Sequence, residues 1–149
     1  DSGAAAAHLE ALDAQECDEL LQSRHFGRIA VVVRASGPGG EEALHPHVVP
    51  IGYVWHDGCV WFRSAGGTKL AAALDAPVAF EIDGTDAQYH SGWSVIVAGR
   101  AELVDDAALL ERLESLPVPR WVPDPLPNWV RIVPERISGR RIPAPFEHR

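Results

Sequence analysis

Positive charge and long apolar runs are both scarce in this sequence, and each shortage excludes a class of partner. Lysine and arginine number 13 against 21 acidic residues, which gives a formal net charge of -8. Such an acidic chain is not expected to bind nucleic acid or anionic membranes, because both select basic surfaces. The longest apolar runs, such as residues 29–33, are strand-length, and no segment resembles a signal peptide. We therefore expect a cytoplasmic protein without nucleic acid or membrane partners, in which a local basic pocket could still hold one phosphate.

Cysteine and recognisable catalytic motifs are scarce as well. Cys17 and Cys59 lie far apart in no metal-spaced pattern, so both are expected to be small buried hydrophobic residues. Ser94 has no histidine and aspartate at a spacing typical of a nucleophile. His45 and His47 could face one side of a strand, as metal or haem ligands do, but no cysteine or carboxylate cluster completes such a site. No metal site is predicted, and haem is kept as an alternative to loop-end histidines.

The length of 149 residues and the hydrophobic share of 46% fit one domain with its own core. Residues 1–12 are expected to form a partly disordered N-terminal extension, residues 13–142 the domain, and residues 143–149 a C-terminal tail. Asp13 followed by Glu16 is typical of a helix N-terminus, and this helix is expected to end at Gly27.

Short strands separated by turn signals dominate the rest of the chain. Asp57-Gly58 indicates a two-residue hairpin, and residues 36–42 have the composition of an exposed hairpin loop. The five prolines of residues 117–127 indicate an extended connector, and helices are expected at residues 68–74 and 105–116. The predicted strands are residues 28–34, 47–55, 59–63, 78–83, 92–104 (bent at Gly99), 129–132 and 136–142, with Pro134 separating the last two. This order favours a closed antiparallel barrel.

The richest segment for chemistry is residues 62–70, which joins a strand end, two glycines and a helix start. Free N–H groups at a helix N-terminus attract phosphate, and the glycines allow close approach of the backbone. Arg63 and Lys69 add positive charge, and Ser64 and Thr68 add hydroxyl donors. The spacing is neither a Walker loop nor a dinucleotide fingerprint, so the phosphate would belong to a mononucleotide. The alternative is a capped surface turn with solvated charges.

A second segment, residues 44–53, has the character of an edge strand. Pro50 removes a ladder donor, and Gly52 indicates a close approach by another group. A planar ring system could dock there on main-chain N–H and C=O groups, or the segment could be a bulged edge strand alone. Trp93, Trp121 and Trp129 could stack on a flat cofactor, although core or interface positions are commoner for tryptophan.

These segments, together with residues 77–83, resemble the pyridoxamine 5′-phosphate oxidase-like superfamily of FMN-binding split barrels, near its nitroimidazole-resistance branch. The resemblance runs from about Leu20 to Gly99 and more weakly to Ile142. It implies a mainly β fold, a six-stranded antiparallel split β-barrel with a few peripheral helices. It also implies a homodimer with FMN in each of two interface clefts.

The resemblance also implies roles for individual residues. Phe62, Arg63 and Ser64 would line the phosphate and ribityl path, and Thr68 and Lys69, followed by Leu70, would hold the phosphate. The residues along the isoalloxazine ring would be His47, Val48, Val49 and Pro50. The residues that would reach across from the partner chain are Trp93 and Ser94, or Trp129.

Two departures limit the functional prediction. Thr68 stands where nitroimidazole-resistance proteins often carry a histidine, which argues against nitro-group reduction. The C-terminal pattern that binds substrate phosphate in true pyridoxamine phosphate oxidases is not recognisable. We therefore expect an FMN-dependent oxidoreductase that transfers hydride to or from an unknown small molecule. The alternatives are a flavin- or haem-binding protein without turnover, and a deazaflavin-dependent reductase, for which a more basic groove would be expected.

Overall fold

The computed structural model describes residues 9–88, 91–119 and 126–143. The predicted tail from residue 144, most of the N-terminal extension and Trp121 lie outside these ranges. Within the extension, residues 9–12 include a short strand, β1 (Glu10–Ala11), whose register partners are Arg141 and Arg140.

The first helix, α2 (Ala14–Ser23), begins as predicted. The Asp13 carboxylate accepts from the Glu16 N–H at 2.8 Å, and the Asp13 N–H donates to the Glu16 carboxylate at 3.4 Å, which completes a capping box. The helix ends before Gly27, so the predicted end there is wrong. Gly27 lies in a strand, where a Cβ atom would approach the Phe80 ring to 2.6 Å; the glycine serves close packing rather than helix termination.

Antiparallel strands form one sheet in the order β3-β2-β6-β7-β8-β5-β4, with β1 on β8. The remaining strands are β2 (Phe26–Ser36), β3 (Glu42–Gly52), β4 (Val54–His56), β5 (Cys59–Ser64), β6 (Pro77–Asp86), β7 (Ser91–Leu103) and β8 (Asn128–Ile142). Within the described ranges, six of the strands are long and β1 and β4 are short. The predicted mainly β, six-stranded split barrel with a few helices is therefore confirmed.

Strand β8 is continuous, although Pro134 was predicted to divide it. A register shift between Ala98 and Gly99 places Gly99 opposite Pro134 and leaves Glu135 without a partner in the ladder. A bulge of this kind accommodates a proline inside a sheet. A Cβ atom at Gly99 would overlap the Val133 carbonyl, so the predicted bend at Gly99 depends on the glycine.

Two hydrophobic clusters stabilise the fold. The first fills the barrel, where Tyr53 and Phe80 meet edge to face with ring centroids 4.7 Å apart. The second lies under helix α4 (Ala107–Leu113), which is capped by Asp106 and is shorter at both ends than the predicted helix of residues 105–116. Its buried members are Trp61, Val104, Leu113 and Trp129.

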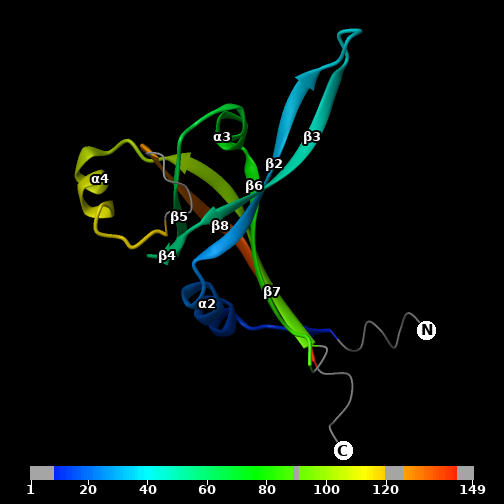
Figure 1. The fold of residues 1–149 in the computed structure, drawn as a ribbon, viewed down its shortest axis with the longest axis vertical. Helices are drawn as coiled ribbons and strands as arrows, with labels where there is room; N and C mark the ends of the chain where they lie inside the picture. Colours follow the sequence, from blue (N-terminus) through cyan, green and yellow to red (C-terminus); the bar gives the residue numbers. More distant parts are fainter. Residues whose placement is uncertain (1–8, 89–90, 120–125, 144–149) are drawn as a thin grey trace, which may run out of the picture.

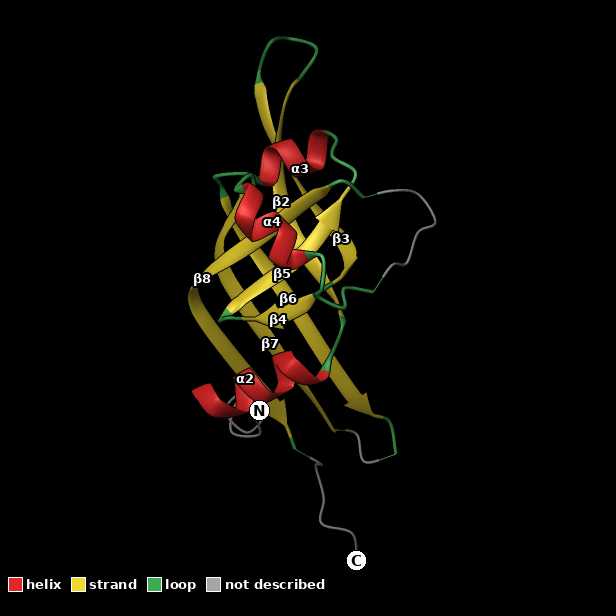
Figure 2. Ribbon diagram, turned by 90° about the vertical axis from the view of Figure 1, so that its left-hand side faces the viewer, coloured by secondary structure: helices red, strands yellow, loops and turns green. Residues whose placement is uncertain are grey.

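The helices lie on one side of the long strands, and in the described part of the chain the opposite side carries none (Figures 1 and 2). Helix α3 (Thr68–Ala73) packs near β2 on the helix-bearing side. Beyond Ala30, strand β2 pairs only with β3, and the two strands leave the body as a projecting arm (Figure 1). None of the helices in the described part of the chain is long and apolar enough to cross a membrane.

Candidate functional site

The barrel is open between strands β3 and β5. Among the described strands, β3 pairs only with β2, and β4 covers β5 only as far as Trp61. Residues 62–64 of β5 therefore pair only with β8. Within the described ranges, the two strand edges on either side of the opening have no further strand partner.

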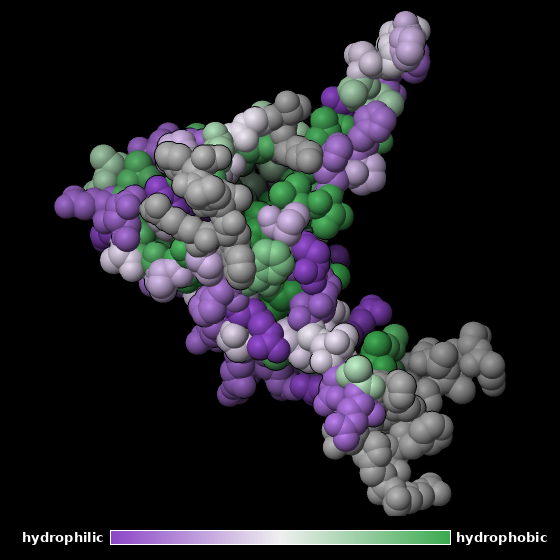
Figure 3. Space-filling model, in the orientation of Figure 1, coloured by the Kyte–Doolittle hydropathy of each residue, from purple (hydrophilic) through white to green (hydrophobic). Residues whose placement is uncertain are grey.

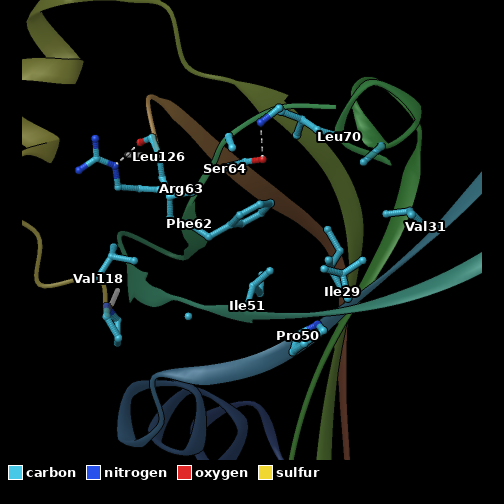
Figure 4. Close-up of a pocket in the computed structure, with 16 residues that line it drawn as sticks. Ile29, Val31, Pro50, Ile51, Phe62, Arg63, Ser64, Leu70, Val118 and Leu126 are labelled. Carbon is cyan, nitrogen blue, oxygen red and sulfur yellow. Dashed lines mark hydrogen bonds between the residues drawn. The ribbon is translucent and has the colours of Figure 1, made fainter. Parts of the chain in front are cut away.

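A cavity of about 290 Å³ occupies this opening, at the base of the arm (Figures 3 and 4). Its walls are mainly apolar, and the Phe62 side chain points into it from β5. The other lining residues are Ile29, Val31, Val49, Pro50, Ile51, Gly52, Arg63, Ser64, Ala65, Gly66, Leu70, Ala73, Val118, Pro119 and Leu126. The predicted set therefore comes together in part, because Val49, Pro50, Phe62, Arg63, Ser64 and Leu70 share this cavity.

A glycine turn forms the rim of the cavity between β5 and α3. The Ser64 hydroxyl accepts from the Gly66 N–H at 3.0 Å. Gly66 and Gly67 have φ values of +98° and +109°, which residues with a side chain rarely adopt, so both glycines are needed for the turn. Thr68 and Lys69 open α3 immediately afterwards. The structure does not describe their side chains, and their role in holding a phosphate stays a prediction.

Arg63 lines the cavity near its backbone, but its guanidinium points away from it (Figure 4). The Nε–H donates to the Leu126 carbonyl at 2.8 Å, and the guanidinium carbon lies 5.1 Å from the centroid of the Trp129 ring. One guanidinium nitrogen also lies 4.0 Å from the Glu114 carboxylate. The side chain is 16% exposed, so these partners hold it behind β5.

Successive side chains of strand β3 point to opposite faces of the sheet, so only part of the predicted ring-binding run, residues 47–50, faces the cavity. Val49 lies on the face of the cavity, and His47, opposite Val31 in the ladder, shares that face one step farther along the arm. Val48 lies on the opposite face and is 65% exposed. The two-residue period of a strand explains the division between Val49 and Val48, whereas Pro50 lines the cavity although it shares the Val48 face by that period.

The three residues predicted to reach a partner chain do not line the cavity. Trp129 is buried in the second cluster. Trp93 lies with its ring 5.2 Å from the Arg24 guanidinium carbon, and Ser94 pairs with Asp83 and Arg140 in the ladder.

The cavity offers little acid–base chemistry of its own. Among its described lining residues, Arg63 and Ser64 alone carry polar side chains. Burial raises the pKa of Tyr53, Cys17 and Cys59, yet none of the three lines the cavity. No group of three or more potential metal ligands occurs in the part of the chain that the structure describes, so His45 and His47 gain no third ligand there. The arrangement is suited to binding a flat, largely apolar group.

Several lining residues were not predicted from the sequence. Ile29 and Val31 belong to an unbroken apolar run, which conceals the alternation that points them inward. Val118, Pro119 and Leu126 belong to the proline-rich connector, which was interpreted only as a link. The connector carries no periodic signal, so nothing in its sequence reveals contact with a cavity.

Comparison with known proteins assigns the family. The profile of the pyridoxamine 5′-phosphate oxidase family matches residues 13–141. The chain belongs to the pyridoxamine 5′-phosphate oxidase family. An uncharacterized protein of Mycobacterium tuberculosis is 33% identical over 139 residues, which is 89% of this chain and 85% of the relative.

Two solved structures of this fold resemble the chain closely. A FAD-binding protein from Mycobacterium smegmatis is 38% identical, with a TM-score of 0.71, over 89% of this chain and 98% of its own. A putative pyridoxamine 5′-phosphate oxidase from Corynebacterium glutamicum is 30% identical, with a TM-score of 0.72, over 93% of this chain and 96% of its own.

Proposed function

We propose that this protein binds a flavin nucleotide, with the isoalloxazine ring in the opening between β3 and β5. The observation that carries the proposal is the pairing of apolar walls with two free strand edges. The isoalloxazine ring matches this combination of apolar and polar surfaces, because its benzenoid end is apolar and its pyrimidine end carries carbonyl and N–H groups. A mostly apolar pocket with a few placed polar groups is typical of cofactor sites. The FAD-binding relative from M. smegmatis supports this assignment.

The cavity would hold the ring, and the rest of the nucleotide would extend over its rim. Its volume of about 290 Å³ is at the lower limit for a pocket that encloses a whole drug-sized ligand. The rim at Gly67 lets a ligand approach the backbone, since no atom of the described residues lies within 4 Å of the place where a Cβ would stand; at Gly66 the Asn128 amide lies 3.4 Å from that place. FMN is the specific expectation from the sequence, whereas the relative binds FAD. The riboflavin phosphate that we assign to this site is common to both.

We further propose that the protein is an oxidoreductase acting on a small molecule. A bound flavin would supply hydride transfer. The chain's own residues would bind and orient it: Phe62 and Ile51 would exclude water from the ring, and the strand edges would fix its polar end. The described lining holds no carboxylate, imidazole or thiol, so the selectivity of the reaction would come from the shape of the site.

A second copy of the chain is the proposed partner, and the bare side of the sheet is its proposed contact surface. Val48, Ala30, Ala79 and Ala98 are direct neighbours across four strands, so they share one face. Ile96 lies two residues before Ala98 on β7 and is 41% exposed. A flat row of small apolar residues allows close approach of a second sheet. The predicted reach of Trp93, Ser94 or Trp129 into a partner's site remains a prediction.

Ala79→Arg tests the proposed dimer. We expect the wild-type protein to be dimeric at micromolar concentration in light scattering, and the variant to be monomeric, because the arginine would be buried without a partner. Ala108→Arg places the same side chain on the exposed surface of α4 and should leave the dimer intact. A monomeric wild-type protein would contradict the proposed interface.

A titration of the purified protein tests flavin binding. FMN, FAD and riboflavin would each be followed by fluorescence quenching and absorbance, with haem and a deazaflavin as parallel samples. We expect saturable flavin binding, micromolar or tighter, with one flavin per chain. No flavin binding, with a shift of the haem Soret band, would contradict the proposal and direct attention to His45 and His47 on β3.

A further inference from the structure

We infer that Arg63 is a positioning residue, which fixes Leu126 as a wall of the cavity and acts on the ligand through that wall. The inference rests on the proposed flavin site, but it departs from the role that the sequence suggested. There Arg63 was expected on the path of the phosphate, where its charge would act directly.

The geometry joins Arg63 to the connector rather than to the cavity. Arg63 and Trp129 are register partners in β5 and β8, which places the Arg63 side chain next to the end of the connector. Its Nε–H donates to the Leu126 carbonyl at 2.8 Å. Leu126 itself lines the cavity, so one hydrogen bond sets the position of a wall residue.

The guanidinium is held by other partners as well. The Trp129 ring lies 5.1 Å from the guanidinium carbon, within the range of a cation–π contact. The Glu114 carboxylate lies 4.0 Å from one guanidinium nitrogen and accepts from the Trp129 Nε1–H at 3.4 Å. To reach a phosphate at the glycine turn, Arg63 would have to give up these contacts, because its side chain points to the other side of β5 (Figure 4).

The wall that Arg63 supports continues into the second hydrophobic cluster. Val118 lines the cavity and also packs on the cluster formed around Trp61 and Trp129. Both described ends of the connector therefore contact the cavity and depend on the same cluster. Without the Arg63 hydrogen bond, Leu126 would no longer be held in place, and the affinity of the cavity for a flat ring would fall.

The chemistry of the contact distinguishes arginine from lysine. An Nε–H donor in a planar guanidinium can bond to a carbonyl while the same plane contacts an aromatic ring. Lysine keeps the positive charge but is a flexible point donor. Arg63→Lys would therefore retain attraction to a phosphate while losing the positioning contact.

The test compares Arg63→Ala and Arg63→Lys in titrations with FMN and with riboflavin, which lacks the phosphate. If Arg63 positions the wall, both variants should weaken both ligands by the same factor, about 10- to 150-fold for loss of a hydrogen bond to a charged group. Normal FMN binding by Arg63→Lys, or a loss confined to FMN, would overturn the inference.

A measurement without flavin separates this inference from the proposed function. Hydrogen exchange at the Asn128 amide, which lies opposite Ser64 in the β5–β8 ladder, should be faster in both ligand-free variants than in the wild-type protein. If the wild-type protein binds no flavin but both variants exchange faster, the proposed function is wrong and the positioning role of Arg63 still holds. Unchanged exchange would overturn that role. Should the Arg63 variants not fold, Glu114→Gln removes one contact of the guanidinium and should give a smaller loss with both ligands; no loss would overturn the inference.

Discussion

Two hollows flank strand β5, and they differ in the groups that they leave free. One is the apolar cavity between β3 and β5. The other lies between α4 and the β4–β5 hairpin and is lined by polar groups that include His56, Arg112 and Arg131. By the number of positively charged side chains in its lining, the second hollow would be a better site for an anion than the first. Such cations are few in a chain of net charge -8.

One of the two arginines of the second hollow, Arg131, is committed to structural contacts. Arg131 pairs with Glu102 at 3.0 Å and lies over the Trp61 ring at 5.4 Å. The Trp61 Nε1–H donates to the His56 carbonyl at 2.7 Å. The first hollow has almost no charge, but among the described strands it leaves two edges without a strand partner. The proposed ring site therefore depends on unpaired strand edges beside apolar walls, and not on a count of charges.

Filling the first hollow gives the largest expected effect. Val49→Trp places an indole on the cavity face of β3, which should lower flavin affinity at least about 100-fold, or about 2.7 kcal/mol. The control is Arg112→Trp, which places the same side chain in the second hollow and should leave affinity unchanged. The two variants would be compared by fluorescence titration, after thermal melts confirm that both fold. The reverse pattern would assign the ligand to the second hollow.

Tyr53→Phe separates the stability of the barrel from the binding of ligand. The buried Tyr53 hydroxyl donates to the Leu21 carbonyl at 2.7 Å, at the end of α2, and burial raises its pKa. Its removal leaves that carbonyl unsatisfied and should cost about 1–3 kcal/mol in urea unfolding. Flavin affinity should stay within about twofold of wild type, since Tyr53 does not line the cavity. A large loss of affinity would show that cavity and core are not separable.

The smallest effect is expected on the bare side of the sheet, at an ion pair that lines neither hollow. Hydrogen bonds with Glu81 and Arg28 hold the pKa of Asp83 below its usual range. Asp83 therefore stabilises the folded state above its unfolded pKa, and this contribution is lost as the pH falls through the folded value. Burial raises the pKa of Glu81, so its contribution has the opposite sign and is lost as the pH rises through its folded value.

Asp83→Asn should accordingly remove part of the acid sensitivity below about pH 4, where Asp83 titrates in the unfolded chain. The expected size is about 0.2–1 kcal/mol for the single chain, in which the pair is partly exposed. Urea unfolding at several pH values measures it. An equal loss of stability in acid for variant and wild type would show that Asp83 contributes nothing there.

Local signals in the sequence predicted the elements whose causes are local. The capping box of α2 and the Asp57-Gly58 hairpin both appear, the latter with φ values of +54° and +70°. Strand β3 was predicted to begin at His47 but begins at Glu42, because pairing with β2 extends it along the arm. The bulge at Pro134 also depends on a neighbouring strand, which no local pattern reports.

For the candidate site, too, the features with local causes were predicted from the sequence, and those that depend on distant segments were not. The glycine turn and the edge character of β3 followed from residue types, and both border the cavity. The direction of the Arg63 side chain could not be predicted, since it depends on Leu126 and Trp129, more than 60 residues away in the chain. Contacts between distant segments decide which residue of a suggestive motif faces the ligand.

A crystal structure of the flavin-loaded protein tests the central claim most directly. The account predicts the isoalloxazine ring between residues 49–52 of β3 and 62–64 of β5, with backbone groups of these edges bonded to its pyrimidine end. A ring bound between α4 and the β4–β5 hairpin, or elsewhere on the surface with the β3–β5 opening empty, would contradict it.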